Sequence, residues 1–323
     1  MSARTVGGWT GEAFAHEAFL YDGAGEVLER VVPFVEEGLE REEATIVVAS
    51  PLVRDALAAR LGSAVEELAV FADSAAFWQG SGQQTLAAYH ESMRPLLEAG
   101  RPWRLVGEPT WLTARGGEAW SRFEAVANDA FAAYPYYSLC LHDRTRVPDH
   151  LVENQLRAHP LVWDGSDVVA SPHYEPTEAF LRSVEPAWTA RPEHVDRTDV
   201  TDCAAARRFV RERIGGSAAE RADDVALAVS ELVANALRAA GRAEVSTWAD
   251  DGTQVWEVAD SGPGLHNASA GYAPPSLDLD GGRGLWLARS LADEVQVRPH
   301  GPGTAIRLSF ATSKVAERQV VGV

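Results

Sequence analysis

The sequence predicts two domains, a doubly wound α/β domain with a mostly parallel sheet and then an α+β sandwich. Three observations predict this arrangement. The chain has 323 residues, more than one typical domain. Its first half alternates helical segments with short runs of β-branched residues, and its last third places helices before strands that pair in hairpins. Hydrophobic residues make up 46% of the chain, so each domain can bury a core.

The first domain is expected to contain four pairs of a helix and a strand. Helices are expected over residues 27–41, 52–61, 83–99 and 118–133, and the strands that follow them over residues 45–50, 68–71, 103–107 and 136–141. Ligands of such sheets lie beyond the carboxyl ends of the strands. The residues expected at that edge are Ser50, Asp73, Gly107, Glu108, His142 and Asp143.

Phosphate chemistry is not expected in the first domain. A phosphate-binding loop with the pattern GxxxxGK needs a lysine shortly after a strand. Lys314, close to the end of the sequence, is the only lysine of the chain. The sequence therefore favours a sensing or docking role for this domain.

A connector is expected between the two domains. Residues 160–199 are rich in proline and contain no long periodic run. We therefore predict one domain over residues 1–160, a proline-rich connector over 161–188, and a second domain over 189–323.

The second domain is expected to begin with helices and to continue with antiparallel strands. The helices are expected over residues 203–213, 218–240 and 285–291, and Gly241 is expected to end the second of them. The strands are expected over residues 243–250, 254–260, 294–298 and 304–310. Asp251 and Gly252 form a strong hairpin signal between the first two strands.

Charge and cysteine usage exclude several classes of function. Asp and Glu outnumber Lys and Arg by 47 to 29, and residues 1–192 hold 28 acids against 15 bases. Such a negative field repels phosphate backbones and anionic lipid headgroups, so we expect no direct binding to nucleic acids or membranes. Cys140 and Cys203 match no metal or redox spacing, and the N-terminus lacks a signal pattern. We therefore expect a cytoplasmic protein with reduced cysteines.

The residues that indicate chemistry lie in the second domain. The phrase ELVANAL places Glu231 and Asn235 four positions apart on a helix, so both side chains can reach one site. The phrase VADSGPGL places Asp260, Gly262 and Gly264 directly after a strand. Each of these phrases alone is a weak signal.

Two further phrases complete the pattern. GGRGLW places Gly282, Arg283 and Gly284 at the start of a helix, where glycines and free N–H groups favour an anionic phosphate. GPGT places Thr304 just before the last strand. The four phrases, in this order and at these places in the predicted elements, form a specific signature.

Residues 190–312 resemble the ATPase domain shared by gyrase and histidine kinases, called GHKL. Within it, SELVANALR and GGRGLWLARSLAD resemble the anti-sigma factor serine kinases. The resemblance implies that Glu231 is the general base for a serine hydroxyl and that Asn235 holds Mg²⁺. It implies that Asp260 accepts a hydrogen bond from the adenine amino group. The other residues implied to contact ATP are Arg238, Gly262, Gly264, Gly282, Arg283, Gly284 and Thr304.

The sequence departs from these kinases at two places. Arg238 is followed by Ala239, where a histidine is usual, and the loop before the last helix supplies Asp278 and Asp280, where a basic residue is expected near the γ-phosphate. These departures keep open a partner-binding module in which ATP is a structural ligand or is not bound.

Residues 14–160 resemble the MEDS sensory domain, a degenerate relative of RecA-like ATPases. The phrases that carry the resemblance are HEAFLYDG, EEATIVVASP, GEPTW, FEAVANDAF, PYYSLCLHD and RAHPLVW. Several polar groups of this domain can line a pocket for a small molecule, although a structural hydrogen-bonding role is favoured for each. They are His16, Tyr21, His90, Glu108, His142 and His159.

Together these resemblances imply an anti-sigma regulator of transcription in a stress response. With ATP and Mg²⁺ bound, its second domain would sequester an RNA polymerase sigma factor and phosphorylate a serine or threonine of an anti-anti-sigma (STAS) partner, under control of the first domain. A homodimer is expected. A sensor histidine kinase is disfavoured, because it needs a dimerising two-helix hairpin with a phosphoacceptor histidine before the ATPase, where the sequence has a proline-rich connector. His194 cannot lie in the middle of a helix that starts before Pro192.

Overall fold

The computed structural model describes residues 9–79, 82–113, 117–185, 188–215, 220–250, 252–272 and 283–311. The chain divides between Leu181 and Arg182 into two compact units. Each unit has its own sheet and its own hydrophobic core. Within the described residues, no helix is long and apolar enough to cross a membrane.

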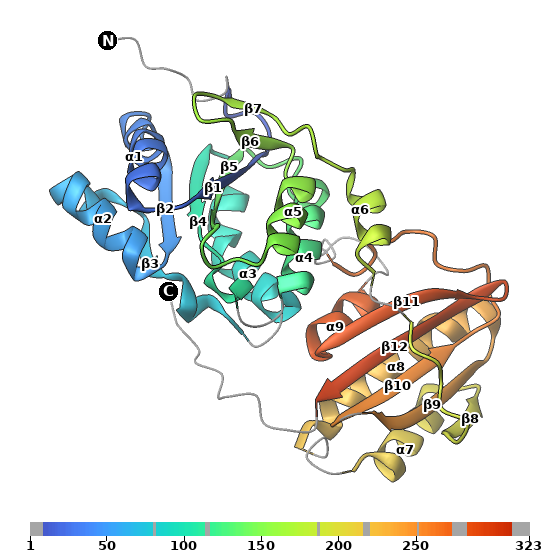
Figure 1. Cartoon of the computed structure of the whole chain (residues 1–323). Helices are drawn as coiled ribbons and strands as arrows, with labels where there is room; N and C mark the ends of the chain where they lie inside the picture. Colours follow the sequence, from blue (N-terminus) through green and yellow to red (C-terminus); the bar gives the residue numbers. More distant parts are fainter. Residues whose placement is uncertain are drawn as a thin grey trace. The chain divides into compact units, whose positions relative to one another are not determined.

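The first unit is built on a sheet of seven strands in the order β3-β2-β4-β5-β1-β6-β7 (Figure 1). Their bounds are β1 Ala15–Tyr21, β2 Ala44–Ala49, β3 Val70–Asp73, β4 Trp103–Gly107, β5 Tyr136–Asp143, β6 Leu161–Trp163 and β7 Val168–Ala170. Neighbouring strands pair parallel, except that β6 and β7 pair antiparallel. The mostly parallel sheet is the one that the sequence predicts.

Helices cover both faces of this sheet. α1 (Ala24–Glu40) and α2 (Pro51–Leu61) pack on one face, and α3 (Gly82–Ala99), α4 (Gly117–Ala130) and α5 (Asp149–Ala158) pack on the other. Three short 3₁₀ turns, at Gly62–Glu67, Ser74–Phe77 and Thr110–Thr113, lie in the connections. The α/β layering predicted from the sequence is therefore present, while the relation to RecA-like ATPases stays a prediction.

Residues 161–188 are not a plain connector. They contain β6 and β7 of the first sheet, and helix α6 at Thr177–Ser183. β6 pairs with β1, with Ala18 opposite Val162. These strands have three residues each, too few for a periodic pattern, so the sequence did not indicate them.

β1 was also missed, although it lies inside the sheet between β5 and β6. It contains His16 and Glu17, whose polarity interrupts the apolar run expected of a buried strand. Both side chains are buried and have partners: Glu17 belongs to an ion pair with α1, and His16 faces α4.

Glu17 and Arg30 form a buried ion pair that joins β1 to α1. Arg30 donates from Nε to Glu17 Oε1 at 2.8 Å and from Nη2 to Glu17 Oε2, and the Tyr137 hydroxyl also donates to Oε2, at 2.6 Å. The side chains of Arg30 and Glu17 are 2% and 0% exposed. Both oxygens of the Glu17 carboxylate thus accept hydrogen bonds from charged or hydroxyl donors. These bonds compensate the cost of removing the two charges from water, so loss of either partner leaves a buried charge unpaired.

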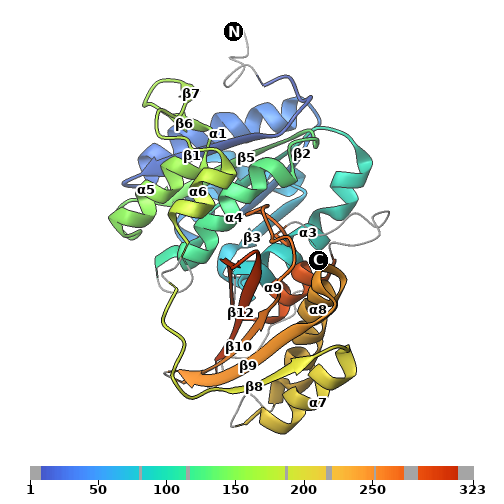
Figure 2. The same ribbon diagram turned by 90° about the vertical axis from the view of Figure 1, so that its right-hand side faces the viewer.

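The second unit is built on five antiparallel strands in the order β11-β12-β10-β9-β8 (Figure 1). Figure 2 shows β12, β10, β9 and β8 from a second side. Their bounds are β8 Asp196–Val200, β9 Ala243–Asp250, β10 Thr253–Ala259, β11 Glu294–His300 and β12 Gly303–Ala311. Gly252 has a φ of 73° in the turn between β9 and β10, as expected of the predicted hairpin. β8 was not predicted, because its sequence DRTDV is polar and it forms an edge of the sheet.

Three helices form one layer on this sheet: α7 (Cys203–Arg213), α8 (Ala222–Ala240) and α9 (Arg283–Leu291). α8 begins with Asp223 and Asp224, whose charges suit the positive end of the helix dipole. It ends at Gly241, which is left-handed with a φ of 74° and donates to Leu237 O at 2.9 Å. The α+β layering and this predicted helix end are confirmed.

The Glu17 and Arg30 pair allows a direct test of the fold. Replacing Arg30 with Met leaves the Glu17 carboxylate buried without its cation, so we expect a loss of about 3–5 kcal/mol in the free energy of unfolding of the first unit. Urea denaturation of the intact chain, followed by circular dichroism, measures it.

Arg144→Met is the matched control, because Arg144 also binds a carboxylate through two nitrogens. Its contacts to Asp22 are 2.9 and 2.6 Å long, but the two side chains are 44% and 55% exposed. We expect this variant to lose about 0–1 kcal/mol. Equal losses in the two variants would refute the importance of the buried pair.

Candidate functional site

Helix α8 presents Glu231 and Asn235 at the margin of its buried face. Leu232, Val233 and Ala236 pack into the core, while Glu231 and Asn235 are partly exposed. The predicted placement of the acid and the amide on one face is therefore present.

Gly284, in the first turn of α9, lies against both of these side chains. A Cβ atom added to Gly284 would lie 2.9 Å from Glu231 Oε2 and 3.2 Å from Asn235 Nδ2. Such distances are tighter than ordinary van der Waals contact, so the missing side chain lets α9 approach α8 at this point. The start of α9 and the polar margin of α8 therefore form one site.

Arg238 lies one turn beyond Asn235 and is exposed. Its guanidinium donates a hydrogen bond to Asn235 Oδ1. Asn235 Oδ1, an oxygen that can coordinate a cation, therefore accepts a hydrogen bond from Arg238, whose exposed side chain can rotate into solvent.

Asp260 follows the last residue of β10 and is held by its neighbours. Its N–H donates to Thr304 O at 2.9 Å, and its Oδ1 accepts from Gly262 N at 2.8 Å. Thr304 Oγ1 in turn accepts from Leu265 N at 2.9 Å. The structure thus brings together the two predicted residues Asp260 and Thr304, although 44 positions of sequence separate them.

Two glycines permit this close approach. A Cβ atom on Gly303 would lie 2.1 Å from Asp260 O, and one on Gly262 would lie 2.8 Å from the Cβ of Ala239 on α8. Gly264 has a φ of 84°, a left-handed conformation that favours glycine. The glycines at 262 and 264, predicted as pocket residues, are therefore required by the backbone geometry.

The loop before α9 was part of the predicted site. Gly282, Asp278 and Asp280 lie outside the described residues, and Arg283 is the exposed first residue of α9. Sequence reasoning missed Arg289, whose Nε donates to Ala270 O at 3.0 Å and whose guanidinium lies 3.9 Å from the centre of the Tyr272 ring. Arg289 thereby fastens the segment after Asp260 to α9. The sequence pattern that could have indicated Arg289 is an arginine at an apolar-face position of the predicted helix.

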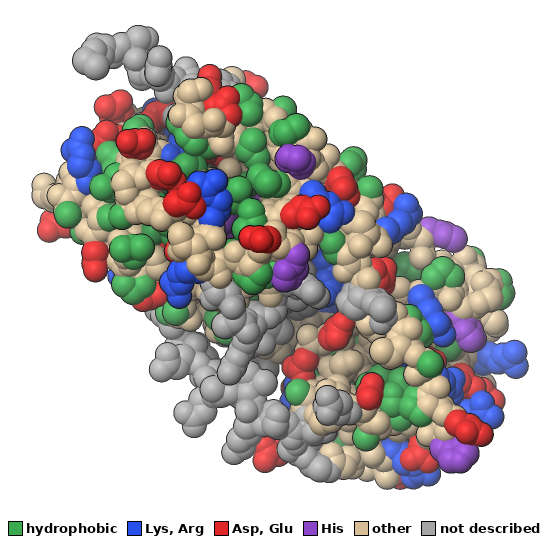
Figure 3. All heavy atoms as spheres, in the orientation of Figure 1, with side chains coloured by type: hydrophobic (Ala, Val, Ile, Leu, Met, Phe, Trp, Pro, Cys, Tyr) green, Lys and Arg blue, Asp and Glu red, His purple; other side chains and the backbone are tan. Residues whose placement is uncertain are grey.

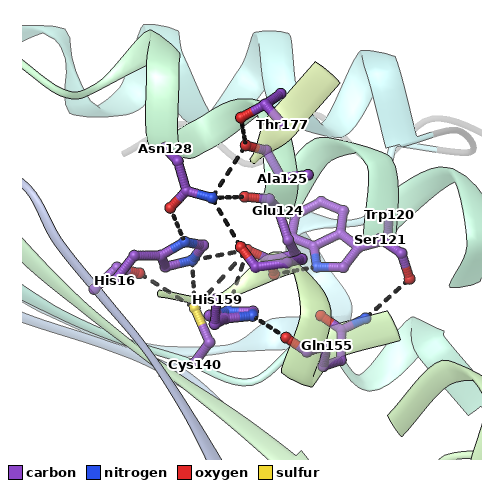
Figure 4. Close-up of polar contacts among 12 residues, drawn as sticks. His16, Trp120, Ser121, Glu124, Ala125, Asn128, Cys140, Gln155, His159 and Thr177 are labelled. Atoms are coloured by element: carbon purple, nitrogen blue, oxygen red, sulfur yellow. Dashed lines mark hydrogen bonds and ion pairs between the residues drawn. The ribbon is translucent and has the colours of Figure 1, made fainter. Parts of the chain in front are cut away.

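A second polar cluster lies in the first unit (Figure 4). His16 Nε2 lies 3.1 Å from Glu124 Oε2 and 3.4 Å from Cys140 Sγ, and His159 Nε2 lies 3.9 Å from the same carboxylate oxygen. Burial and the Glu124 carboxylate raise the pKa of the Cys140 thiol. His16 and His159 were predicted as polar residues, whereas Glu124 and the participation of Cys140 were missed.

Of the remaining polar residues singled out in the first domain, Tyr21 and Glu108 have structural partners. Tyr21 donates to Glu108 Oε1 at 2.7 Å, and Ser50 N donates to Glu108 Oε2 at 2.7 Å, so this carboxylate is satisfied at the carboxyl edge of the sheet. Both ring nitrogens of His142 are buried without a hydrogen-bond partner among the described residues, and its ring centre lies 5.5 Å from that of His159. Burial lowers the pKa of His142 to about 4, so its ring is neutral. The side chain of His90, on α3, lies outside the described residues.

Asp73 and Asp143, also expected at this edge, act as turn caps. Asp73 Oδ1 accepts from Ala75 N at 2.9 Å, and Asp143 Oδ1 accepts from Thr145 N at 2.9 Å. Gly107 is the last residue of β4, and a Cβ atom added to it would lie 3.9 Å from the Tyr89 hydroxyl. Asp73 and Asp143 therefore stabilise local structure, whereas Gly107 and Glu108 line a cavity, as expected of this edge of the sheet.

Comparison with family models identifies both units. Residues 15–160 match the MEDS domain, described as the methanogen/methylotroph, DcmR sensory domain, and residues 189–310 match the histidine kinase-like ATPase domain. The chain is therefore a fusion of a MEDS sensory domain with a histidine kinase-like ATPase domain, which makes it a regulatory ATPase module of signalling. No curated protein matches the chain.

The contact between Gly303 and Asp260 predicts the effect of a single methyl group. Gly303→Ala places a Cβ against backbone atoms that cannot rotate away, so we expect a loss of about 1–3 kcal/mol in the free energy of unfolding of the ATPase domain. Gly215→Ala is the control, because a Cβ there meets no atom within 4 Å. Thermal unfolding of both variants measures the difference, and an unchanged Gly303→Ala protein would contradict the described geometry.

Proposed function

We propose that the ATPase domain binds ATP with Mg²⁺ and phosphorylates a serine or threonine of an anti-anti-sigma (STAS) partner, and that its ATP-bound form sequesters a sigma factor. The MEDS domain would control the exchange between these two partners. The observation that carries the proposal is the convergence of Glu231, Asn235 and Gly284 at the start of α9.

The Asp260 corner fits an adenine base. The Gly262 amide holds one oxygen of the Asp260 carboxylate, and the other oxygen has no hydrogen bond within the part of the chain that the structure describes. A carboxylate oxygen accepts from the exocyclic amino group of adenine, and the Thr304 hydroxyl beside it can bond to a ring nitrogen. Gly262 and Gly264 let the backbone around this corner pack closely, because Cβ atoms there would lie 2.8 Å from Ala239 Cβ and 3.3 Å from Pro302 O.

The margin of α8 fits the phosphates and their cation. Mg²⁺ prefers hard oxygen ligands, and when bound it neutralises the charge of the phosphates. Asn235 would hold it through Oδ1 after Arg238 turns away. The N–H groups at the start of α9, with Arg238 and Arg283, would face the phosphates.

Glu231 would be the general base. Its Oε2 atom points toward Gly284, beside the amide of Asn235, so a hydroxyl brought to the phosphates would find a carboxylate within reach. Removing the hydroxyl proton as the oxygen attacks phosphorus is the role that phosphoryl transfer asks of such a group.

A histidine-kinase activity receives no support from the histidine at the start of the ATPase domain. His194 is exposed in a bend between Pro192 and the first residue of β8, outside any helix. Figure 3 shows acidic side chains interspersed with arginines on the face drawn, in keeping with protein partners rather than a polyanion.

Nucleotide binding tests the adenine contact. Asp260→Asn keeps the oxygen that accepts from Gly262 but can place an NH₂ group against the adenine amino group, so we expect the dissociation constant for Mg-ATP to rise at least about tenfold. Asp250→Asn, at the exposed end of β9, is the control and should bind as the wild type does. Calorimetric titration measures both, and equal affinity in the two variants would refute the contact.

Phosphate transfer tests the general base. The intact protein is mixed with labelled Mg-ATP and purified STAS proteins; we expect phosphoserine or phosphothreonine on one of them. Glu231→Gln should slow the transfer by about 10²–10⁴-fold without loss of ATP binding. Asp223→Asn, an exposed acid at the start of α8, should transfer normally.

Two results would redirect the proposal. ATP binding without any transfer would make the domain a partner-binding module with a structural nucleotide. Label on a histidine of the chain itself would make it a histidine kinase.

A further inference from the structure

Four metal-ligating side chains meet inside the MEDS domain, far from the ATP site in sequence. They come from four different places: His16 from β1, Glu124 from α4, Cys140 from β5, and His159 from the residue after α5. They are 2%, 3%, 5% and 0% exposed. One ligand atom from each lies within 4.8 Å of all the others.

The distances match the edges of a coordination tetrahedron. With metal–ligand distances of 2.0–2.3 Å, the ligand atoms of a tetrahedral zinc site lie roughly 3.3–3.8 Å apart. Here the Glu124 oxygen lies 3.1 Å from His16 Nε2, 3.9 Å from His159 Nε2 and 3.9 Å from Cys140 Sγ, and the sulfur lies 3.4 Å from His16 Nε2. The two remaining edges, from His159 Nε2 to His16 Nε2 and to Cys140 Sγ, are no longer than 4.8 Å. Shifts of up to about 1 Å would bring all six edges to tetrahedral values.

Hydrogen bonds fix the tautomer of His159. Its Nδ1 lies 2.7 Å from the backbone oxygen of Gln155, which can only accept, so Nδ1 carries the proton. In the neutral ring, Nε2 then offers a lone pair. This atom is buried without a hydrogen-bond partner among the described residues and is directed into the cluster.

The same reasoning applies to His16. Its Nδ1 lies 3.0 Å from Asn128 Oδ1, while the NH₂ group of that amide donates to Ala158 O at 2.8 Å and to Ala125 O at 3.1 Å. These two carbonyls assign the orientation of the amide, so Nδ1 of His16 donates to the amide oxygen. Nε2 is then the ring atom that faces the cluster, 3.1 Å from Glu124 Oε2, and it offers a lone pair to a metal ion when it carries no proton. Such outer partners are usual for histidines that bind metals.

Glu124 supplies a negative charge at the same point. Its Oε1 accepts from Trp120 Nε1 at 2.5 Å, which leaves Oε2 facing both imidazoles and the sulfur. The lone pair of His159 Nε2 and the Glu124 carboxylate oxygen converge in a buried space, which is costly unless a positive charge lies among them. A metal ion supplies that charge, as would a proton on His16 Nε2, 3.1 Å from Glu124 Oε2. The single S–H proton of Cys140 can serve only one of these acceptors.

We propose that His16, Glu124, Cys140 and His159 form a buried binding site for a divalent transition-metal ion of the zinc type. Two imidazoles, one thiolate and one carboxylate are a ligand set typical of tetrahedral zinc. A cavity of about 40 Å³ borders His16, Glu124 and Cys140 on the side away from His159, so these three side chains have space into which they can adjust. The site is independent of the function proposed for the ATPase domain.

Metal analysis of the intact, tag-free protein tests the site. After loading with Zn²⁺ and removal of loosely bound ions, we expect about one zinc per chain, the content of a single closed site. The metal-free protein is then titrated with Co²⁺, which reports geometry: we expect the intense visible bands of tetrahedral cobalt and a near-ultraviolet thiolate charge-transfer band.

Variants locate the site. Cys140→Ser should remove the thiolate band, and His159→Gln should lower the metal content at least about tenfold. Cys203→Ser, which changes the partly buried cysteine of α7, should leave both signals unchanged. Because the wild-type protein gives the spectrum, the test does not depend on the folding of a variant.

Two outcomes would overturn the proposal. A wild-type protein that retains no zinc and gives no tetrahedral cobalt bands would make the cluster a hydrogen-bonded core network. A thiolate band that survives Cys140→Ser and disappears in Cys203→Ser would place the metal elsewhere.

Discussion

The ATPase domain depends on backbone contacts that only glycine permits. Gly303 approaches Asp260 so closely that a Cβ atom on the glycine would lie 2.1 Å from the carbonyl oxygen of Asp260. In the first turn of α9, the missing side chain of Gly284 lets the helix lie against Glu231 and Asn235. These two contacts connect β10, β12, α8 and α9. The first contact brings Thr304 to Asp260, and the second places the start of α9 against Glu231 and Asn235. Because they connect backbone segments, the positions of the polar side chains follow from the fold.

In the MEDS domain, by contrast, several charged and polar side chains are buried in the core. Glu17 is neutralised by Arg30 on the α1 side of the sheet, while Glu124, on the other side, meets two imidazoles and a thiol. A buried carboxylate needs a cation or several donors. Arg30 supplies the cation for the first carboxylate, and we assign a metal ion to the second. The chain thus combines a domain with polar groups at its margin and a domain with polar groups at its centre.

The sequence predicted what is local. Glu231 and Asn235 share one helix, Asp260 directly follows a strand, and Gly241 ends a helix, so spacing alone placed them correctly. The strand β1 escaped because His16 and Glu17 break its apolar run, and β6 and β7 are too short to show a period. The cluster in the MEDS domain escaped because its members come from separate elements; His16 and Cys140 are 124 positions apart. Only the order of the strands, which places β1 beside β5, brings them together.

The central claim is that the corner formed by Asp260 and Thr304 recognises adenine. Titrating the intact protein with Mg-ATP and with Mg-ITP tests it directly, because inosine carries a carbonyl oxygen where adenine carries its amino group. Facing the Asp260 carboxylate, that oxygen would be repelled. We expect ATP to bind at least about tenfold more tightly than ITP. Equal affinity for the two nucleotides, or binding of neither, would contradict it.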